Sequence, residues 1–370
     1  MKLKTAVSTA IAATILSASA ATLSEGDPAP KLYVSKWVQG EPVKAFQPGT
    51  VYLVEFWATW WTPCKEALAH VNRLHQKYKD KGLVVIGQNV KEPHGTNIEP
   101  FIKRMGELMS YRVALDEGAT NRLSGKMQEN WLYAAEAGIP TAFIIDKKGN
   151  ISFIGHPEEI DEQLIEQVLA GTFDPKKRAL DREATAAKAE EWETHNELGR
   201  AAWKAKQWDK AMSEIDQMEK LFPHKRALTQ CLRITVFIRK EDFEAASNLA
   251  LQLSNDNRED PFLQHRVAQT IANQARLKYR IEGFERDLIF EGATNNIILK
   301  TADLLMERAI SLMKGPEPEF LHTQAQLAFL QGKREKAIQL ATEAVGLAEP
   351  GIKDQFAEAL ENFKQDRLPQ

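Results

Sequence analysis

Residues 51–67 read VYLVEFWATWWTPCKEA, and this stretch decides the fold. Its first seven residues form a nearly unbroken run of β-branched and aromatic side chains, interrupted by one carboxylate, Glu55. A run of this kind, without alternation, is typical of a strand that is buried on both faces. Between Leu68 and Tyr78 the apolar residues recur at a helical spacing. We therefore predict that Cys64 lies where a buried strand passes into a helix.

The stretch resembles the thioredoxin superfamily, and most closely its secreted bacterial branch, the TlpA/ResA-like redoxins. The family motif is aromatic-Trp-Ala-x-Trp-Cys-x-Pro-Cys, and residues 56–64 read FWATWWTPC. Trp61 stands where the family has its first, attacking cysteine, and Cys64 stands where the family has its second, resolving cysteine. The resemblance also places Glu55 where thioredoxins carry a buried acid that helps to move the proton of the second thiol.

The tryptophan at position 61 excludes the usual reaction of this family. Disulfide exchange needs a thiolate that attacks and a second thiol that releases the mixed disulfide. A Cys-x-x-Cys disulfide cannot form in WTPC, so one-thiol chemistry at Cys64 or no redox chemistry remains. A free cysteine titrates near ~8.5; apolar burial raises that pKa and a helix N-terminus lowers it. We expect a thiol of low reactivity.

A second match is GIPT at residues 138–141. In the family the equivalent proline follows a cis peptide bond and lies against the active-site cysteines, so the resemblance implies a cis bond before Pro140. Such a proline leaves neighbouring backbone groups able to pair with an extended peptide. Exposed tryptophans beside that edge would favour apolar peptides. The predicted substrate-binding residues are Trp60, Trp61, Pro63, Ile139, Pro140 and Thr141.

The expected order of elements over about residues 26–171 is that of thioredoxin, with an inserted section near residues 91–135. The predicted fold is therefore an α/β domain over residues 21–172, with a central mixed sheet flanked by helices. Around the motif strand and helix we expect strands at 31–38, 43–46, 83–86, 111–115, 142–145 and 151–154, and helices at 101–109, 127–137 and 158–170.

The second half of the chain, residues 173–370, reads as helices only. Asp174 can cap a helix that begins at Pro175. Four positions match the spacing of tetratricopeptide repeats, which are paired antiparallel helices: Leu198, Gly199, Ala211 and Pro223. Second-helix starts are expected near residues 208, 241–246 and 333–337. We predict stacked helical hairpins that hold a protein partner; the alternative is an irregular bundle that only supports the first domain.

The N-terminus has the pattern of a secretory signal. Lys2 and Lys4 precede an uncharged, mostly small and apolar stretch, and Ala18-Ser19-Ala20 is a cleavage-type triplet. That stretch is too short and too weakly apolar for a membrane span. We predict that residues 1–20 are removed and that the protein is exported to a bacterial periplasm. The net charge of −3, without a basic patch, gives no reason to expect nucleic acid.

The remaining candidate groups are few. The two cysteines, Cys64 and Cys231, could pair in an exported protein. Cys231, however, lies in an apolar helix-like segment of the predicted second domain, and we interpret it as a buried free thiol. His70 and His75 are five residues apart, and no Cys/His spacing fits zinc. We expect neither a metal nor a cofactor.

These patterns support two main hypotheses. The first is an exported redoxin that acts on protein thiols and disulfides through Cys64, with Glu55 handling the proton. The second is a non-catalytic scaffold that binds peptides or proteins with both domains. A peroxiredoxin-like antioxidant is a third, because the reactive cysteine of peroxiredoxins occupies the helix position of Cys64. The peroxiredoxin motif, however, has a threonine where Trp61 stands, and its arginine has no clear counterpart.

Overall fold

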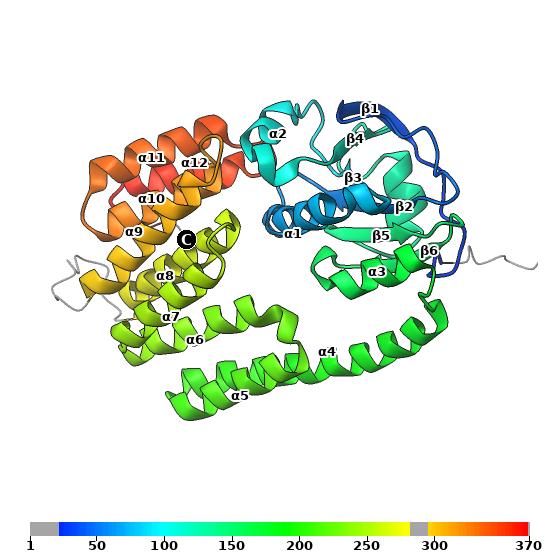
Figure 1. Cartoon of the computed structure of the whole chain (residues 1–370). Helices are drawn as coiled ribbons and strands as arrows, with labels where there is room; N and C mark the ends of the chain where they lie inside the picture. The colour runs from blue at the N-terminus through cyan, green and yellow to red at the C-terminus, as the bar shows by residue number, and fades with distance from the viewer. Residues whose placement is uncertain (1–21, 282–294, 369–370) are drawn as a thin grey trace, which may run out of the picture.

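A computed structural model describes residues 22–281 and 295–368, and the predicted signal segment lies outside them. A sheet with helices comes first in the chain, and helices follow (Figure 1). The strands are β1 (Val34–Gln39), β2 (Val51–Trp57), β3 (Leu83–Asn89), β4 (Arg112–Asp116), β5 (Thr141–Ile145) and β6 (Ile151–Gly155). The helices are α1 (Thr62–Tyr78), α2 (Glu99–Met105), α3 (Glu162–Ala170), α4 (Pro175–Lys204), α5 (Trp208–Leu221), α6 (Arg226–Lys240), α7 (Phe243–Asp256), α8 (Pro261–Ile281), α9 (Asn295–Ser311), α10 (Pro318–Leu330), α11 (Arg334–Leu347) and α12 (Lys353–Lys364).

The described part of the chain forms one six-stranded sheet in the order β1-β4-β3-β2-β5-β6. Strand β2 pairs in parallel with β3 and antiparallel with β5, so the predicted mixed sheet is confirmed. Every residue of β2 is buried, because successive side chains point to opposite faces and both faces are covered. One face packs under α1, α2 and α3, and the other packs against a turn that contains Trp131.

Element ends shift by a few residues, and three local predictions differ most from the structure. Residues 43–46 form no strand; instead the ring of Phe46 packs on Tyr52, with ring centroids 4.9 Å apart. The helix expected at 127–137 is a short π-helical turn, Gln128–Tyr133. Helix α3 begins later than expected, because the side chain of Asp161 accepts a hydrogen bond from the Leu164 amide and caps the first turn there.

The second half folds as neighbouring helix pairs: α4 with α5, α6 with α7, α8 with α9, and α10 with α11. Within the described ranges beyond residue 175 there is no strand. Helices α5, α7 and α11 begin within two residues of the predicted second-helix starts. We call residues 175–368 the helical half. In the described residues, no helix is both long enough and apolar enough to cross a bilayer.

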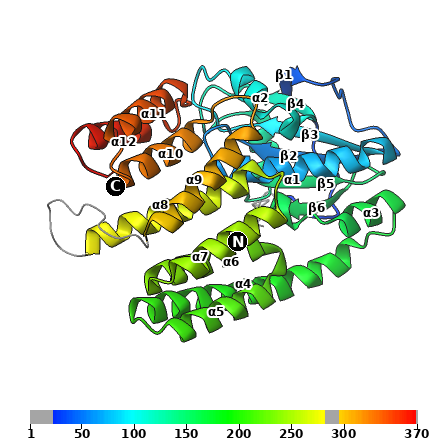
Figure 2. The same ribbon diagram turned by 60° about the vertical axis from the view of Figure 1, so that its left-hand side comes forward.

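The helical half begins after α3 and extends away from the sheet (Figures 1 and 2). Its helix α8 and the start of α10 then pack against α1 and α2. One continuous apolar core contains side chains of α1 and α2 together with side chains of α6 to α10. The return is therefore a packed interface.

A buried ion cluster holds that interface. Lys65 of α1 has only 1% of its side chain exposed, and its Nζ lies 2.6 Å from Glu317 Oε1 and 2.6 Å from Glu319 Oε1. The Nε of Arg104 lies 3.2 Å from Glu317 Oε2, and its guanidinium also binds Glu349. Because each cation comes from the sheet-containing half and each carboxylate from the helical half, separating the halves would leave buried charges without partners.

Removing the charge of Lys65 should therefore destabilise the protein strongly. We expect Lys65→Met to lower the free energy of unfolding in urea by about 3–5 kcal/mol, because Glu317 and Glu319 lose their buried partner. The matched control is Lys36→Met, which breaks an exposed pair with Glu99 and should cost no more than about 1 kcal/mol. Equal losses in the two variants would contradict the assignment.

Candidate functional site

The motif turn places Cys64 in the first turn of α1, as the sequence predicts. Trp61 is the residue that caps this helix, in an extended conformation with φ −101° and ψ 104°. The amide of Cys64 donates a hydrogen bond to the carbonyl of Trp61 at 2.9 Å. The Cys64 side chain is fully buried, whereas Trp61 is 41% exposed. The tryptophan thus occupies the outward position and the thiol the inward one.

A residue that the sequence analysis missed, Glu92, holds the loop between β2 and α1. Its carboxylate accepts hydrogen bonds from the amide of Thr59 at 2.7 Å, from the Thr59 hydroxyl at 2.9 Å and from Asn89 Nδ2 at 2.8 Å. Burial raises the pKa of Glu92, and these hydrogen bonds oppose the rise. Its position just after β3 could have revealed this role, because β3 runs parallel to β2 and the two strands end at the same edge of the sheet.

The environment of Cys64 disfavours its thiolate. Burial raises the pKa of Cys64 well above its ordinary value, and the charge of Glu55 raises it further. A backbone hydrogen bond with Ala58 and the charge of Lys65 act in the opposite direction. The expectation of a thiol of low reactivity agrees with this direction.

Glu55 lies in the middle of β2 and has no exposed surface. Burial raises its pKa to about 8, and neither carboxylate oxygen has a hydrogen-bond partner among the described residues. A carboxyl in this state is mostly protonated at neutral pH. Tyr111 belongs to the same environment, because burial and the charges of Glu55 and Cys64 raise the pKa of its hydroxyl.

The peptide bond between Ile139 and Pro140 is cis, as the resemblance implied. Thr141 begins β5 and pairs with Phe56 near the end of β2. The register therefore puts the cis proline beside the loop that leads to Cys64. Ile139 and Pro140 are half-buried and Thr141 is buried, and Pro63 in the first turn of α1 is half-buried.

The helical half covers part of the predicted substrate surface. Trp60 is half-buried and donates its indole N–H to the Lys91 carbonyl at 2.9 Å. The Arg122 guanidinium lies 4.3 Å from the centroid of its ring. The backbone of Gly351 approaches so closely that a Cβ there would lie 2.6 Å from the Trp60 Cβ. Trp60 is therefore a contact of the helical half, and Trp61 is the tryptophan that faces outward.

A cavity of about 300 Å³ lies beside these contacts, between the start of α1 and the helical half. Thr62 lines it from α1, Gln269 from α8 and Phe356 from α12. Glu319 and His322 line it from α10. The site is thus a buried thiol, Cys64, that packed helices shield from solvent, with a partly polar cavity beside the neighbouring Thr62.

The sequence is similar to one family model and to several known proteins. The AhpC/TSA family model matches residues 26–154. Protein FixW from Rhizobium leguminosarum is 28% identical over 218 residues, which cover 55% of this chain and 94% of FixW. The thiol-disulfide oxidoreductase ResA from Bacillus thuringiensis subsp. konkukian is 30% identical over 143 residues, which cover 38% of this chain and 75% of ResA.

Two solved structures each match 40% of the chain. A thiol-disulfide isomerase from Corynebacterium glutamicum is 22% identical with a TM-score of 0.34, covering 40% of this chain and 97% of that protein. A DsbE-type thiol:disulfide interchange protein from Chlorobium tepidum is 27% identical with a TM-score of 0.28, covering 40% of this chain and 99% of that protein.

The buried carboxyl of Glu55 should make stability depend on pH. Its pKa is about 8 in the folded protein and 4.5 in the reference state, so the folded chain keeps a proton that the unfolded chain releases between these values. The stability that this proton contributes is complete below the lower pKa and is lost as pH rises through the upper one.

We therefore expect wild type to lose stability relative to Glu55→Gln from pH 5 to pH 8, by about 1.4 kcal/mol per pH unit. Urea denaturation at several pH values measures this difference. The exposed carboxyl of Glu107 supplies the control, since Glu107→Gln should leave the profile parallel to wild type. A parallel profile for Glu55→Gln would show that Glu55 is ionised in the folded protein.

Proposed function

The chain belongs to the thioredoxin-like redoxin family that includes the ResA thiol-disulfide oxidoreductases, and on this premise we propose that it is an exported redoxin that acts on protein thiols and disulfides through one thiol, Cys64. In this proposal residues 1–20 are a signal segment, residues 21–172 are the redoxin domain, and residues 173–370 are a repeat-type helical domain. The relatives named as thiol-disulfide oxidoreductases support the substrate class.

The observation that carries the proposal is the position of the Cys64 thiol. It lies in the first turn of α1, where the charge of the buried Glu55 carboxyl raises its pKa, while β5 places Pro140 at the same edge of the sheet. A peptide paired along residues 139–141 would present a sulfur to this turn. Trp61, on the outward side, would contact the apolar side chains of that peptide.

The reaction is a thiol-disulfide exchange. The Cys64 thiolate attacks one sulfur of a substrate disulfide, a mixed disulfide forms, and the other substrate sulfur leaves as a thiolate. Glu55, in its ionised fraction, takes the proton of Cys64. A second thiol of the substrate or a small external thiol then releases the chain. Because Cys64 is fully buried in the packed state, the helical half has to separate from α1 before the substrate reaches the sulfur.

The full burial of Cys64 also favours the second hypothesis, a non-catalytic scaffold. A thiol that never becomes accessible would only fill the core between the halves. In that case the exposed Trp61 and the helical half would bind protein partners, and substituting Cys64 would not change that binding.

Capture of a substrate on Cys64 separates the two hypotheses. We expect the full chain, incubated with an unfolded protein that contains a disulfide, to form an adduct that dissolves with dithiothreitol and contains Cys64. The adduct should form in Cys231→Ser and be absent in Cys64→Ser, because only Cys64 has the attacking position. Non-reducing gels and mass spectrometry of the adduct measure this. If Cys231→Ser yields no adduct under conditions that keep it folded, the scaffold hypothesis stands instead.

A further inference from the structure

The two cysteines of the chain come from its two halves and meet in one core. Cys64 is on α1 and Cys231 is on α6. Both are free thiols, with 0% and 5% of their surfaces exposed. Both belong to the same continuous cluster of buried side chains. The sequence allowed the two cysteines to pair in an exported protein, but it favoured a buried free thiol at Cys231 in a different domain.

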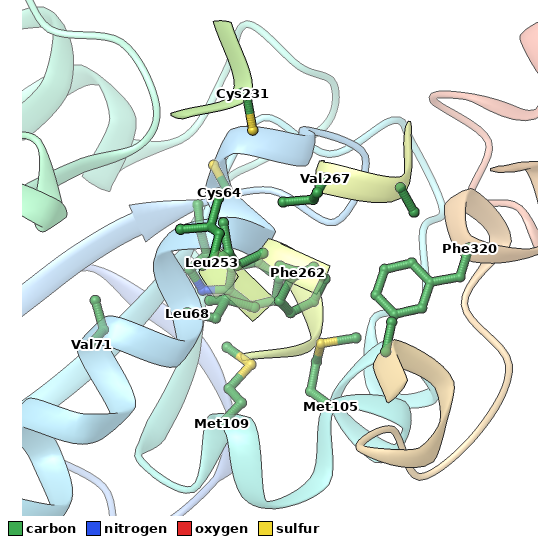
Figure 3. Close-up of a cluster of buried hydrophobic side chains, with 14 of the residues drawn as sticks. Cys64, Leu68, Val71, Met105, Met109, Cys231, Leu253, Phe262, Val267 and Phe320 are labelled. Atoms are coloured by element: carbon green, nitrogen blue, oxygen red, sulfur yellow. The ribbon is translucent and has the colours of Figure 1, made fainter. Parts of the chain in front are cut away.

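Figure 3 shows how the two thiols are arranged. The side chain of Cys64 rises from the start of α1, the side chain of Cys231 descends from α6, and the sulfurs point toward one another. Leu68, Phe262 and Val267 lie in the same view and belong to the same cluster. In this view the two thiols face each other within the buried cluster that the halves share.

A separate observation places Cys231 at the same end of α1. Glu66, two residues after Cys64, binds Arg266 of α8, with Arg266 Nε 2.8 Å from Glu66 Oε1. Burial raises the pKa of Cys231, a hydrogen bond with Thr270 and the charge of Arg266 lower it, and the charge of Glu66 raises it. A carboxylate near the start of α1 thus acts on the thiol of α6.

We propose that Cys231 is the second thiol of the redox site, and that Cys64 and Cys231 form a disulfide that joins the two halves of the chain. The inference rests on the proposed function and adds to it the group that releases the substrate. The family places its partner thiol three residues before Cys64, where this chain has Trp61. Here the partner thiol would come from 167 residues further along the chain.

The exchange then balances within the protein. Cys64 attacks the substrate disulfide, forming one sulfur–sulfur bond and releasing the first substrate thiolate. Cys231 gives its proton to that thiolate and attacks the Cys64 sulfur, which breaks the mixed disulfide. The second substrate sulfur leaves as a thiolate and takes the proton that Glu55 received from Cys64. The substrate gains two electrons and two protons, and the cysteine pair is oxidised. An external dithiol of the thioredoxin class would reduce the pair again. Because a disulfide holds its sulfurs ~2.05 Å apart, α6 and α1 must draw together as the bond forms.

Oxidation of the full chain tests the pair directly. Wild type, Cys64→Ser and Cys231→Ser are incubated in buffers with graded ratios of oxidised to reduced glutathione, then alkylated, digested and analysed by mass spectrometry. We expect wild type to give one linked pair of peptides, which contain Cys64 and Cys231, and a higher Tm than the reduced chain. Glutathione adducts on the separate cysteines, or two unreacted thiols in the folded chain, would overturn the inference.

Lifetimes of the substrate adduct distinguish this inference from the function on which it rests. We expect the adduct on Cys64 to last at least about tenfold longer in Cys231→Ser than in wild type, because the releasing thiol is gone. Cys231→Ala serves as a second variant, because its apolar side chain puts no hydroxyl into the buried site. Equal lifetimes would overturn the role of Cys231 while the function of Cys64 stands. A linked peptide pair without any substrate adduct would support the pair and overturn the proposed function.

Discussion

The structure depends on one buried cation, the ammonium group of Lys65. It has almost no contact with water and is neutralised by Glu317 and Glu319 from the helical half. Burial raises the pKa of Glu317 to about 7, while the charge of Lys65 opposes that rise. A pair of this kind is costly to form, and it is far costlier to break from one side. Its geometry therefore fixes where the helical half returns to the sheet.

This constraint bears on function because Lys65 directly follows Cys64 in the sequence. The residue that docks the helical half and the residue that would carry the chemistry share the first turn of α1. Glu92 holds the loop before this turn through hydrogen bonds from Thr59, and the backbone of Gly351 packs closely against Trp60 in the same loop. The packed state thus protects the thiol, and access to Cys64 becomes a property of the interface between the halves.

Sequence patterns and the family resemblance were sufficient for the fold and for the place of Cys64 at the start of α1. The stretch around FWATWWTPC predicted the strand, the turn and the helix, because these depend on neighbours in the chain. The cis proline was implied by the resemblance of GIPT to the family. The cover could not be predicted in the same way. Lys65 and Glu317 form an ion pair although they are 252 residues apart in the sequence. The residues around each of them give no sign of this pairing. The interpretation of Cys231 as a buried free thiol is confirmed. Its place in the same cluster as Cys64 depends on how the helices fold back, which local patterns do not reveal.

Accessibility of Cys64 is the most direct measure of whether the ion cluster controls the site. The measurement is the rate at which iodoacetamide alkylates Cys64 in the folded Cys231→Ser chain, with and without Glu317→Ala. Because Glu317 pairs with both Lys65 and Arg104, its loss should open the interface and raise the rate at least about tenfold. The exposed variant Lys36→Met should keep the slow rate. Fast alkylation of the parent chain, or an unchanged slow rate after Glu317→Ala, would contradict the account.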